Sequence, residues 1–173
     1  MAGVTQPLRA EHQELLPHIE SLREIAGEVG VTSTSRLRAD VDEALEFLEG
    51  HLVPHAHAEE AALYPVVARV MGAPAATATM SRDHVEVGRY VQRLIELRDR
   101  LTGDELAGGL AHDLRGALYG LYALLRLHFA KEEEVYLPLL DERLTQNEAV
   151  HMFEAMEEAA AAAKRGSTPE KLR

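Results

Sequence analysis

The 173-residue chain contains no cysteine and no tryptophan. Without a thiol it can form no structural disulfide, thiolate zinc site, iron–sulfur cluster or cysteine nucleophile. A chain that needs no disulfide suits a reducing compartment, so we expect a cytoplasmic protein. Aromatic residues make up only 5% of the chain. This is too few to build stacking platforms for nucleic-acid bases or sugars.

Long apolar runs and an excess of positive charge are also missing. No stretch reaches the roughly 18 apolar residues that a membrane-spanning helix needs. The N-terminal Met-Ala-Gly-Val-Thr-Gln-Pro has neither the basic nor the apolar part of a secretory signal, so we expect no export. The 18 Lys and Arg are outnumbered by 29 Asp and Glu, which gives a formal net charge of −11. Because such a field repels a polyanion, we expect no nucleic-acid partner.

The composition predicts an all-α fold. Alanine, leucine, glutamate and arginine dominate, β-branched residues rarely cluster, and the length is that of one domain. Helical periodicity predicts four long helices, over about Leu8–Val29, Leu37–Met71, Ala76–Leu101 and Glu105–Leu140, followed by a helix over Asn147–Lys164. We therefore expect residues 1–146 to form an up-down-up-down four-helix bundle and residues 147–173 to form a C-terminal helix and a disordered tail.

Prolines interrupt two of the predicted helices. Pro54 and Pro65 fall within the second long helix, and Pro138 falls near the end of the fourth. Each removes a backbone donor, so we expect a kink or a division at each position.

One motif occurs twice, 73 residues apart. The two copies are His55-Ala-His-Ala-Glu59-Glu60-Ala-Ala-Leu-Tyr-Pro65 and His128-Phe-Ala-Lys-Glu132-Glu133-Glu-Val-Tyr-Leu-Pro138. An acidic-His-x-Glu tetrapeptide precedes each copy: Glu11-His12-Gln13-Glu14 and Asp83-His84-Val85-Glu86. His12 precedes His55 by 43 residues and His84 precedes His128 by 44. The chain thus consists of two related helical hairpins, each with one His and then a His-x-x-x-Glu pair.

These residue types and spacings predict a two-metal centre. Residues four apart share a helix face, and the faces that carry the His-x-x-x-Glu pairs are otherwise apolar. A buried unpaired carboxylate costs on the order of several kcal/mol, so two of them need a cation. Imidazole and carboxylate without thiolate suit iron or manganese, and also zinc or copper. Glu59 and Glu132 are the expected bridges, with terminal ligands His12, His55, His84 and His128.

The same pattern resembles the hemerythrin-like cation-binding (HHE) proteins, from about residue 8 to residue 145. The resemblance implies a four-helix bundle around two non-haem iron ions, joined by an oxo or hydroxo bridge, that bind O2 and in relatives NO or peroxide. It is compatible with catalase-like peroxide detoxification. The alternatives are a gas or iron sensor or storage protein without catalytic turnover, and a structural bundle whose site holds zinc or nothing.

Two positions depart from the hemerythrins that carry O2 reversibly. Those proteins have a further His four residues after the third-helix His, where this chain has Gly88. They also place the last acid five residues after its His, which makes Glu133 the rival of Glu132. Without that further histidine one metal lacks a ligand. The candidates to fill the vacant coordination position are water, a tyrosine or Glu86. An iron with one ligand fewer is better suited to activating peroxide or O2 than to storing O2.

The remaining histidines and tyrosines are predicted to be structural or solvent-exposed. Glu60 and Glu133 are expected to turn off the ligand face, as acceptors for ligand imidazoles or as surface charges. Tyr64 and Tyr136 are expected to pack the bundle, although a phenol beside an open iron can bind it. The residues predicted to lie at the surface or at the bundle end are His18, His51, His57, His112 and His151.

Overall fold

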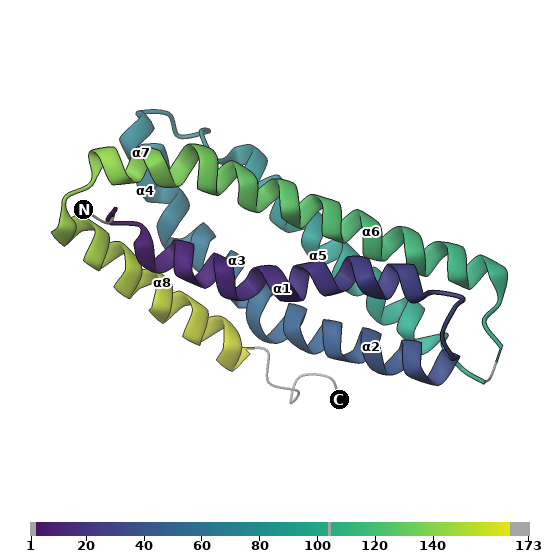
Figure 1. The fold of residues 1–173 in the computed structure, drawn as a ribbon. Coiled ribbons are helices and arrows are strands. Elements are labelled where there is room, and N and C mark those ends of the chain that lie inside the picture. The colour runs from purple at the N-terminus through teal and green to yellow at the C-terminus, as the bar shows by residue number, and fades with distance from the viewer. Residues whose placement is uncertain (1–2, 104, 167–173) are drawn as a thin grey trace.

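The computed structural model describes residues 3–103 and 105–166, and every regular element in these residues is helical (Figure 1). The helices are α1 (Gln6–Glu28), α2 (Thr34–Phe47), α3 (Val53–Ala58), α4 (Tyr64–Met71), α5 (Ala78–Asp99), α6 (Gly108–Lys131), α7 (Leu137–Arg143) and α8 (Gln146–Gly166). Three π-helical turns join some of them: η1 (Leu48–Leu52), η2 (Glu59–Leu63) and η3 (Glu132–Tyr136). The all-α prediction is confirmed. The predicted disordered tail, beyond Gly166, lies outside the described residues.

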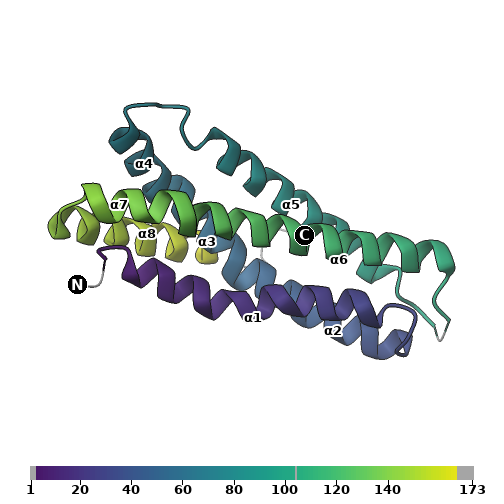
Figure 2. The same cartoon turned by 45° about the horizontal axis from the view of Figure 1, so that its top comes forward.

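The four predicted helices form an antiparallel bundle. One continuous rod runs from α2 through η1, α3 and η2 to α4, and another runs from α6 through η3 to α7. α1 packs against α2 and α6, and α5 packs against the same two neighbours. The α1–α2 and α5–α6 connections lie at one end, and the N-terminus lies at the other end, beside the α7–α8 corner (Figures 1 and 2).

Local signals explain where several helices begin and end. α1 stops at Glu28, shortly before Gly30, which has a φ of 80°. The Ser33 side chain caps α2 by accepting a hydrogen bond from the Arg36 backbone N–H at 3.3 Å. Gly72, with a φ of 64°, ends α4 in the left-handed conformation that favours glycine.

The prolines bend the rods without dividing them. Pro54, Pro65 and Pro138 each lie at the second residue of a helix that follows a π-helical turn. A proline clashes with the carbonyl four residues earlier, and the wider π turn accommodates this clash while the helix continues. Two of these turns begin at Glu59 and Glu132. Two of the π-helical turns that accommodate a proline therefore begin at the two predicted bridging carboxylates.

A buried polar layer separates two apolar clusters. Along α1, Leu8 belongs to the cluster at the α8 end, Leu15 belongs to the cluster at the opposite end, and His12 lies between them. Along α5, His84 lies in the same way between Met80 and Val87. The polar layer thus crosses the whole bundle at one level.

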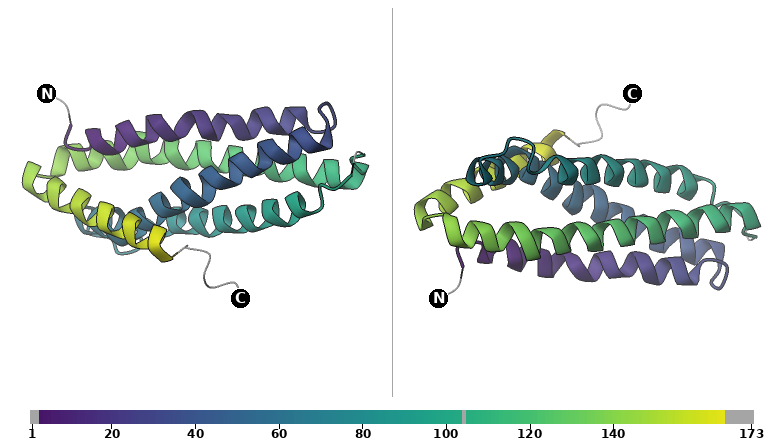
Figure 3. Two further views of the ribbon diagram at one scale, coloured as in Figure 1. Left: turned by 90° about the horizontal axis from the view of Figure 1, so that it is seen from below. Right: turned by 90° about the horizontal axis from the view of Figure 1, so that it is seen from above.

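The C-terminal helix α8 covers the outside of α3 and η2 (Figure 3). Met152 and Met156 are buried there, and Ala159 and Ala160 pack partly against the same apolar cluster. No helix in the described residues is long and apolar enough to cross a bilayer.

Candidate metal centre

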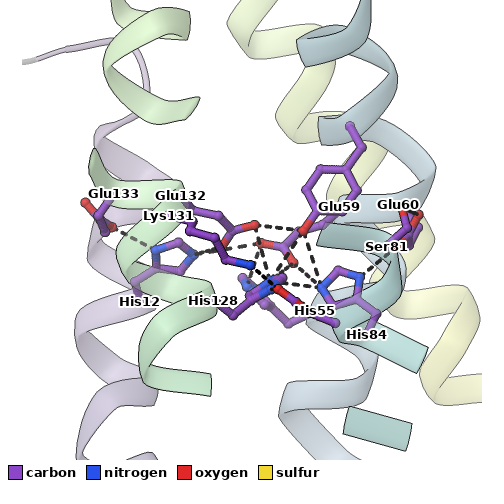
Figure 4. Close-up of polar contacts among 12 residues, drawn as sticks. His12, His55, Glu59, Glu60, Ser81, His84, His128, Lys131, Glu132 and Glu133 are labelled. Atoms are coloured by element: carbon purple, nitrogen blue, oxygen red, sulfur yellow. Dashed lines mark hydrogen bonds and ion pairs between the residues drawn. The ribbon is translucent and has the colours of Figure 1, made fainter. Parts of the chain in front are cut away.

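The polar layer contains all six predicted ligand residues, which point toward one another from six helical elements (Figure 4). In chain order they are His12 of α1, His55 of α3, Glu59 of η2, His84 of α5, His128 of α6 and Glu132 of η3. Five of the six are buried. The His84 side chain is the most accessible, with 10% exposed.

The ligand atoms form two groups that share one carboxylate. The first position is defined by His12, His55, Glu59 and Glu132, and the second by Glu59, His84 and His128; within each group the atoms lie within 4.8 Å of one another. In the second group the two imidazole Nε2 atoms are 3.1 Å apart. Two neighbouring ligands of one ion with bonds of about 2.1 Å lie about 3.0 Å apart in octahedral geometry. The spacing is therefore that of ligands around a metal ion.

Glu59 offers one oxygen to each position. Its Oε1 lies 3.0 Å from Nε2 of His55 and 3.9 Å from Nε2 of His12. Its Oε2 lies 3.2 Å from Nε2 of His84 and 3.9 Å from Nε2 of His128. A carboxylate held in this way can bridge two ions.

Glu132 spans the two positions from the opposite side. Its Oε2 lies 3.6 Å from Nε2 of His12, and its Oε1 lies 3.5 Å from Nε2 of His128. Glu133 points outward instead and reaches the other ring nitrogen of His12, Nδ1. Of the two rival acids, Glu132 is the one whose carboxylate lies inside the cluster.

Each of the four imidazoles is hydrogen-bonded through Nδ1 to an outer carboxylate. The pairs are His12 with Glu133 at 2.7 Å, His55 with Glu11 at 3.0 Å, His84 with Glu60 at 2.8 Å, and His128 with Asp83 at 3.2 Å. Because an ionised carboxylate can only accept, Nδ1 carries the proton in each pair, and Nε2 is the atom that turns toward the centre. This is the arrangement in which metal-ligating imidazoles are held.

Sequence reasoning found only half of these outer carboxylates. It predicted the role of Glu60 and Glu133 as imidazole acceptors or surface charges, and both accept from an imidazole. It did not assign Glu11 or Asp83. The available signal was the acidic residue directly before the His in both tetrapeptides.

Most of the outer carboxylates are themselves held in place. Arg9 binds Glu133, Lys131 binds Asp83, and the Ser81 hydroxyl donates to Glu60 at 2.8 Å. These contacts restrict the carboxylates and thereby the orientation of the imidazole rings.

The inner groups are strongly coupled electrostatically. Burial lowers the pKa of His128, but the carboxylates of Glu132 and Glu59 outweigh it and raise the pKa to about 10. Burial likewise opposes the charge on His55, yet Glu59 and Glu11 hold its pKa well above the usual value. Burial and the neighbouring Glu59 charge raise the pKa of Glu132. Without a metal, protons on imidazoles therefore balance the buried carboxylates, and an incoming cation would displace them.

Several inner atoms have no hydrogen-bond partner although they are fully buried. They are Nε2 of His12, Nε2 of His55, both carboxylate oxygens of Glu59, and Oε2 of Glu132. Leaving one such group unsatisfied costs about 1–3 kcal/mol. All of them converge on the two positions, and nitrogen and carboxylate oxygen are donors for divalent and trivalent cations. The residues present therefore fit a metal centre.

Tyr64 joins the cluster at the second position. Its hydroxyl donates to Glu132 Oε1 at 2.9 Å and lies 3.4 Å from Nε2 of both His84 and His128. Burial and the two inner carboxylates raise its pKa, so the phenol is protonated in the metal-free protein. Of the two roles considered for Tyr64, packing in the bundle and a place beside the metal, the contacts favour the second.

The other side chains considered for the coordination position vacant at Gly88 lie outside the cluster. Glu86 pairs with Arg82 and Arg89 at the surface. The Tyr136 hydroxyl donates to the backbone carbonyl of Ala76 at 3.1 Å. Among the side chains considered for this place, Tyr64 is the one in contact with the ligand atoms.

The remaining histidines do not reach the cluster. His18 and His51 are exposed and stack on Phe47, with centroid distances of 4.5 Å and 6.2 Å. The exposed histidines also include His57, His112 and His151. Their predicted placement outside the site is confirmed.

A helical bundle with a buried layer of imidazoles and carboxylates, several of them unpaired, belongs to the class of cation-binding bundles. Comparison with family models gives the particular family: the one described as the hemerythrin HHE cation binding domain matches residues 4–140. The chain belongs to this family. Comparisons with curated proteins and with solved structures gave no significant match. The family match ends before α8, which begins at Gln146.

Proposed function

We propose that this chain is a cytoplasmic di-iron protein that binds or reacts with O2, NO or peroxide. The observation that carries the proposal is the convergence on two adjacent positions of buried nitrogen and oxygen atoms that lack a hydrogen-bond partner. Iron is preferred over zinc because the donors are nitrogen-rich, lack thiolate, and include two carboxylates that each span both positions.

The two positions would hold one iron each. Glu59 and Glu132 would be shared between them, His12 and His55 would hold the first ion, and His84 and His128 would hold the second. The Tyr64 hydroxyl supplies a further oxygen at the second position.

When bound, the irons supply redox chemistry and a coordination place for a small ligand. The chain supplies the remaining features. The outer carboxylates orient the imidazoles, the apolar clusters on both sides exclude water from the layer, and Tyr64 holds a proton 2.9 Å from Glu132 Oε1. A second position with a phenol and no fifth histidine favours reaction with peroxide or O2 over reversible O2 storage.

Metal analysis tests the proposal directly. The protein purified from iron-supplemented cells is expected to contain two irons per chain and to show the absorption bands of a bridged ferric pair. A ligand present at about 1,000 times its Kd stabilises the folded state by about 4 kcal/mol. Chelation is therefore expected to lower Tm by roughly 10 °C in a chain of this length. Far less than one iron per chain, together with a Tm that chelation leaves unchanged, would mean a structural bundle.

Hydrogen peroxide turnover distinguishes an enzyme from a sensor or storage protein. Iron-loaded protein is expected to release O2 from hydrogen peroxide, and His84→Gln is expected to abolish this release. Stoichiometric NO binding without peroxide turnover would instead support the sensor or storage function.

A further inference from the structure

Two surface clefts occupy equivalent places between the two hairpins, because each has one wall from either hairpin. The first cleft, of about 400 Å³, lies between α1 and α6 and reaches His12 and Glu133. The second cleft, of about 390 Å³, lies between α3 and α5 and reaches His84 and Glu60. The motif repeat relates the two linings position by position. The clefts can therefore be compared residue by residue.

Bulky side chains cover the imidazole of the first cleft. Phe129, which is 4% exposed, stacks on the His12 ring with a centroid distance of 4.5 Å and an interplanar angle of 23°. Leu16, one turn after His12, packs partly buried against the apolar core. The His12 side chain is accordingly only 2% exposed.

Small residues occupy the equivalent places in the second cleft. Ala56 is the counterpart of Phe129, and Gly88 is the counterpart of Leu16. A Cβ atom added at Gly88 would meet nothing within 4 Å. Gly88 lies inside α5, has no positive φ, and costs about 1 kcal/mol of helix stability relative to alanine. No backbone requirement explains this glycine, and its lack of a side chain leaves the space beside His84 open.

The second cleft is also the less charged of the two. Val53 and Val85 line it where the first cleft has Arg126 and Gln13. Its one carboxylate, Glu60, uses one oxygen for His84 and the other for Ser81. The lining contains no lysine or arginine to attract an anion, its histidines being His57 and His84, and the net charge of −11 disfavours anions further.

We propose that the second cleft is the binding and access site for a small uncharged ligand of the second position, such as dissolved O2 or NO, rather than an anion. This inference rests on the proposed function and names the route and the chemical class of its ligand. In the first cleft, Phe129 covers the imidazole, and His12 is 2% exposed against 10% for His84.

The metal-free protein provides one test, with dissolved O2 as the probe. Val87 and Val91 are both 3% exposed on α5, but only Val87 lines the cleft. Paramagnetic relaxation by O2, measured by NMR, is expected to be faster for the Val87 methyl groups than for those of Val91. Gly88→Leu is expected to remove this difference. Equal rates in the unsubstituted protein would overturn the proposal.

The iron-loaded protein provides the second test, with NO as the probe. Gly88→Leu and Ala56→Phe each place a residue of the size found in the first cleft into the second. Both variants are expected to retain the iron content and to slow NO association by roughly fivefold or more, because the path is obstructed. The control Leu16→Ala is expected to leave the rate unchanged. Wild-type NO rates in both cleft variants, with full iron content, would overturn the proposed access route.

The two proposals can fail separately. If the wild-type protein holds no iron or binds no NO, the di-iron function fails, while the O2 relaxation test still decides whether the cleft takes up an uncharged gas. To test the ligand class, Val85→Lys places a cation at the rim. It is expected to raise the ratio of the azide rate to the NO rate; an unchanged ratio would contradict selection by charge.

Discussion

The two hairpins carry the same polar residues and different aromatic ones. Phe129 of the second hairpin stacks on His12 of the first, whereas Tyr64 of the first hairpin stacks on His84 of the second with a centroid distance of 5.4 Å and adds its hydroxyl to the cluster. The motif counterpart of Phe129 is Ala56, and that of Tyr64 is Leu137. The repeated residues account for cation binding, whereas the residues that do not repeat make the two positions chemically different.

The largest expected effect comes from replacing Glu59, the carboxylate that faces both metal positions. Glu59→Gln preserves the side-chain volume but removes the charge that faces both positions, so we expect loss of both irons. Its Tm should equal that of chelated wild-type protein. The exposed Glu134→Gln is the matched control and should retain two irons. Full iron content in Glu59→Gln, measured by elemental analysis, would exclude Glu59 as a bridge.

The next largest effect is expected from variants that remove a ligand of one metal position only. His84→Gln leaves the first group of four residues intact, so we expect one iron per chain to remain. His12→Gln removes a ligand from that group and should weaken iron binding at the first position instead. Elemental analysis and the absorption spectrum measure the iron bound by each variant. Complete loss of iron in His84→Gln would show that the positions fill only together.

The sequence predicted the fold and the inner ligands because both depend on periodic, repeated residues. His55 with Glu59, for example, lies on one helix face by spacing alone. It did not decide between Tyr64 and Tyr136, which lie one position out of register in the two motifs, and only Tyr64 reaches the layer. The contacts of Tyr64 are to residues of other helices, and the spacing of residues along one helix does not show how the helices pack against one another.

A smaller effect is expected from the outer carboxylates. Glu11→Ala removes the acceptor that orients His55, and loss of such a partner typically reduces metal affinity about 10–100-fold. Glu14→Ala, one turn further along α1, is the control, because Glu14 is exposed and does not contact the cluster. Competition with a metal-binding dye measures the affinities. Equal affinities in the two variants would mean that Glu11 does not position the imidazole.

The smallest effect on stability should come from the two tyrosine hydroxyls, whose removal distinguishes the hairpins most finely. Tyr136→Phe loses one hydrogen bond to a backbone carbonyl and should cost about 1 kcal/mol in unfolding free energy, with no change in the iron spectrum. Tyr64→Phe leaves Glu132 without its donor, so a similar cost is expected in the metal-free protein. In the ferric protein it should also remove any phenolate-to-iron absorption band. Urea unfolding measures the first effect and visible spectroscopy the second. Identical ferric spectra for Tyr64→Phe and wild type would show that the phenol acts only through Glu132, and the second position would then lack a side-chain oxygen beyond the bridging carboxylates.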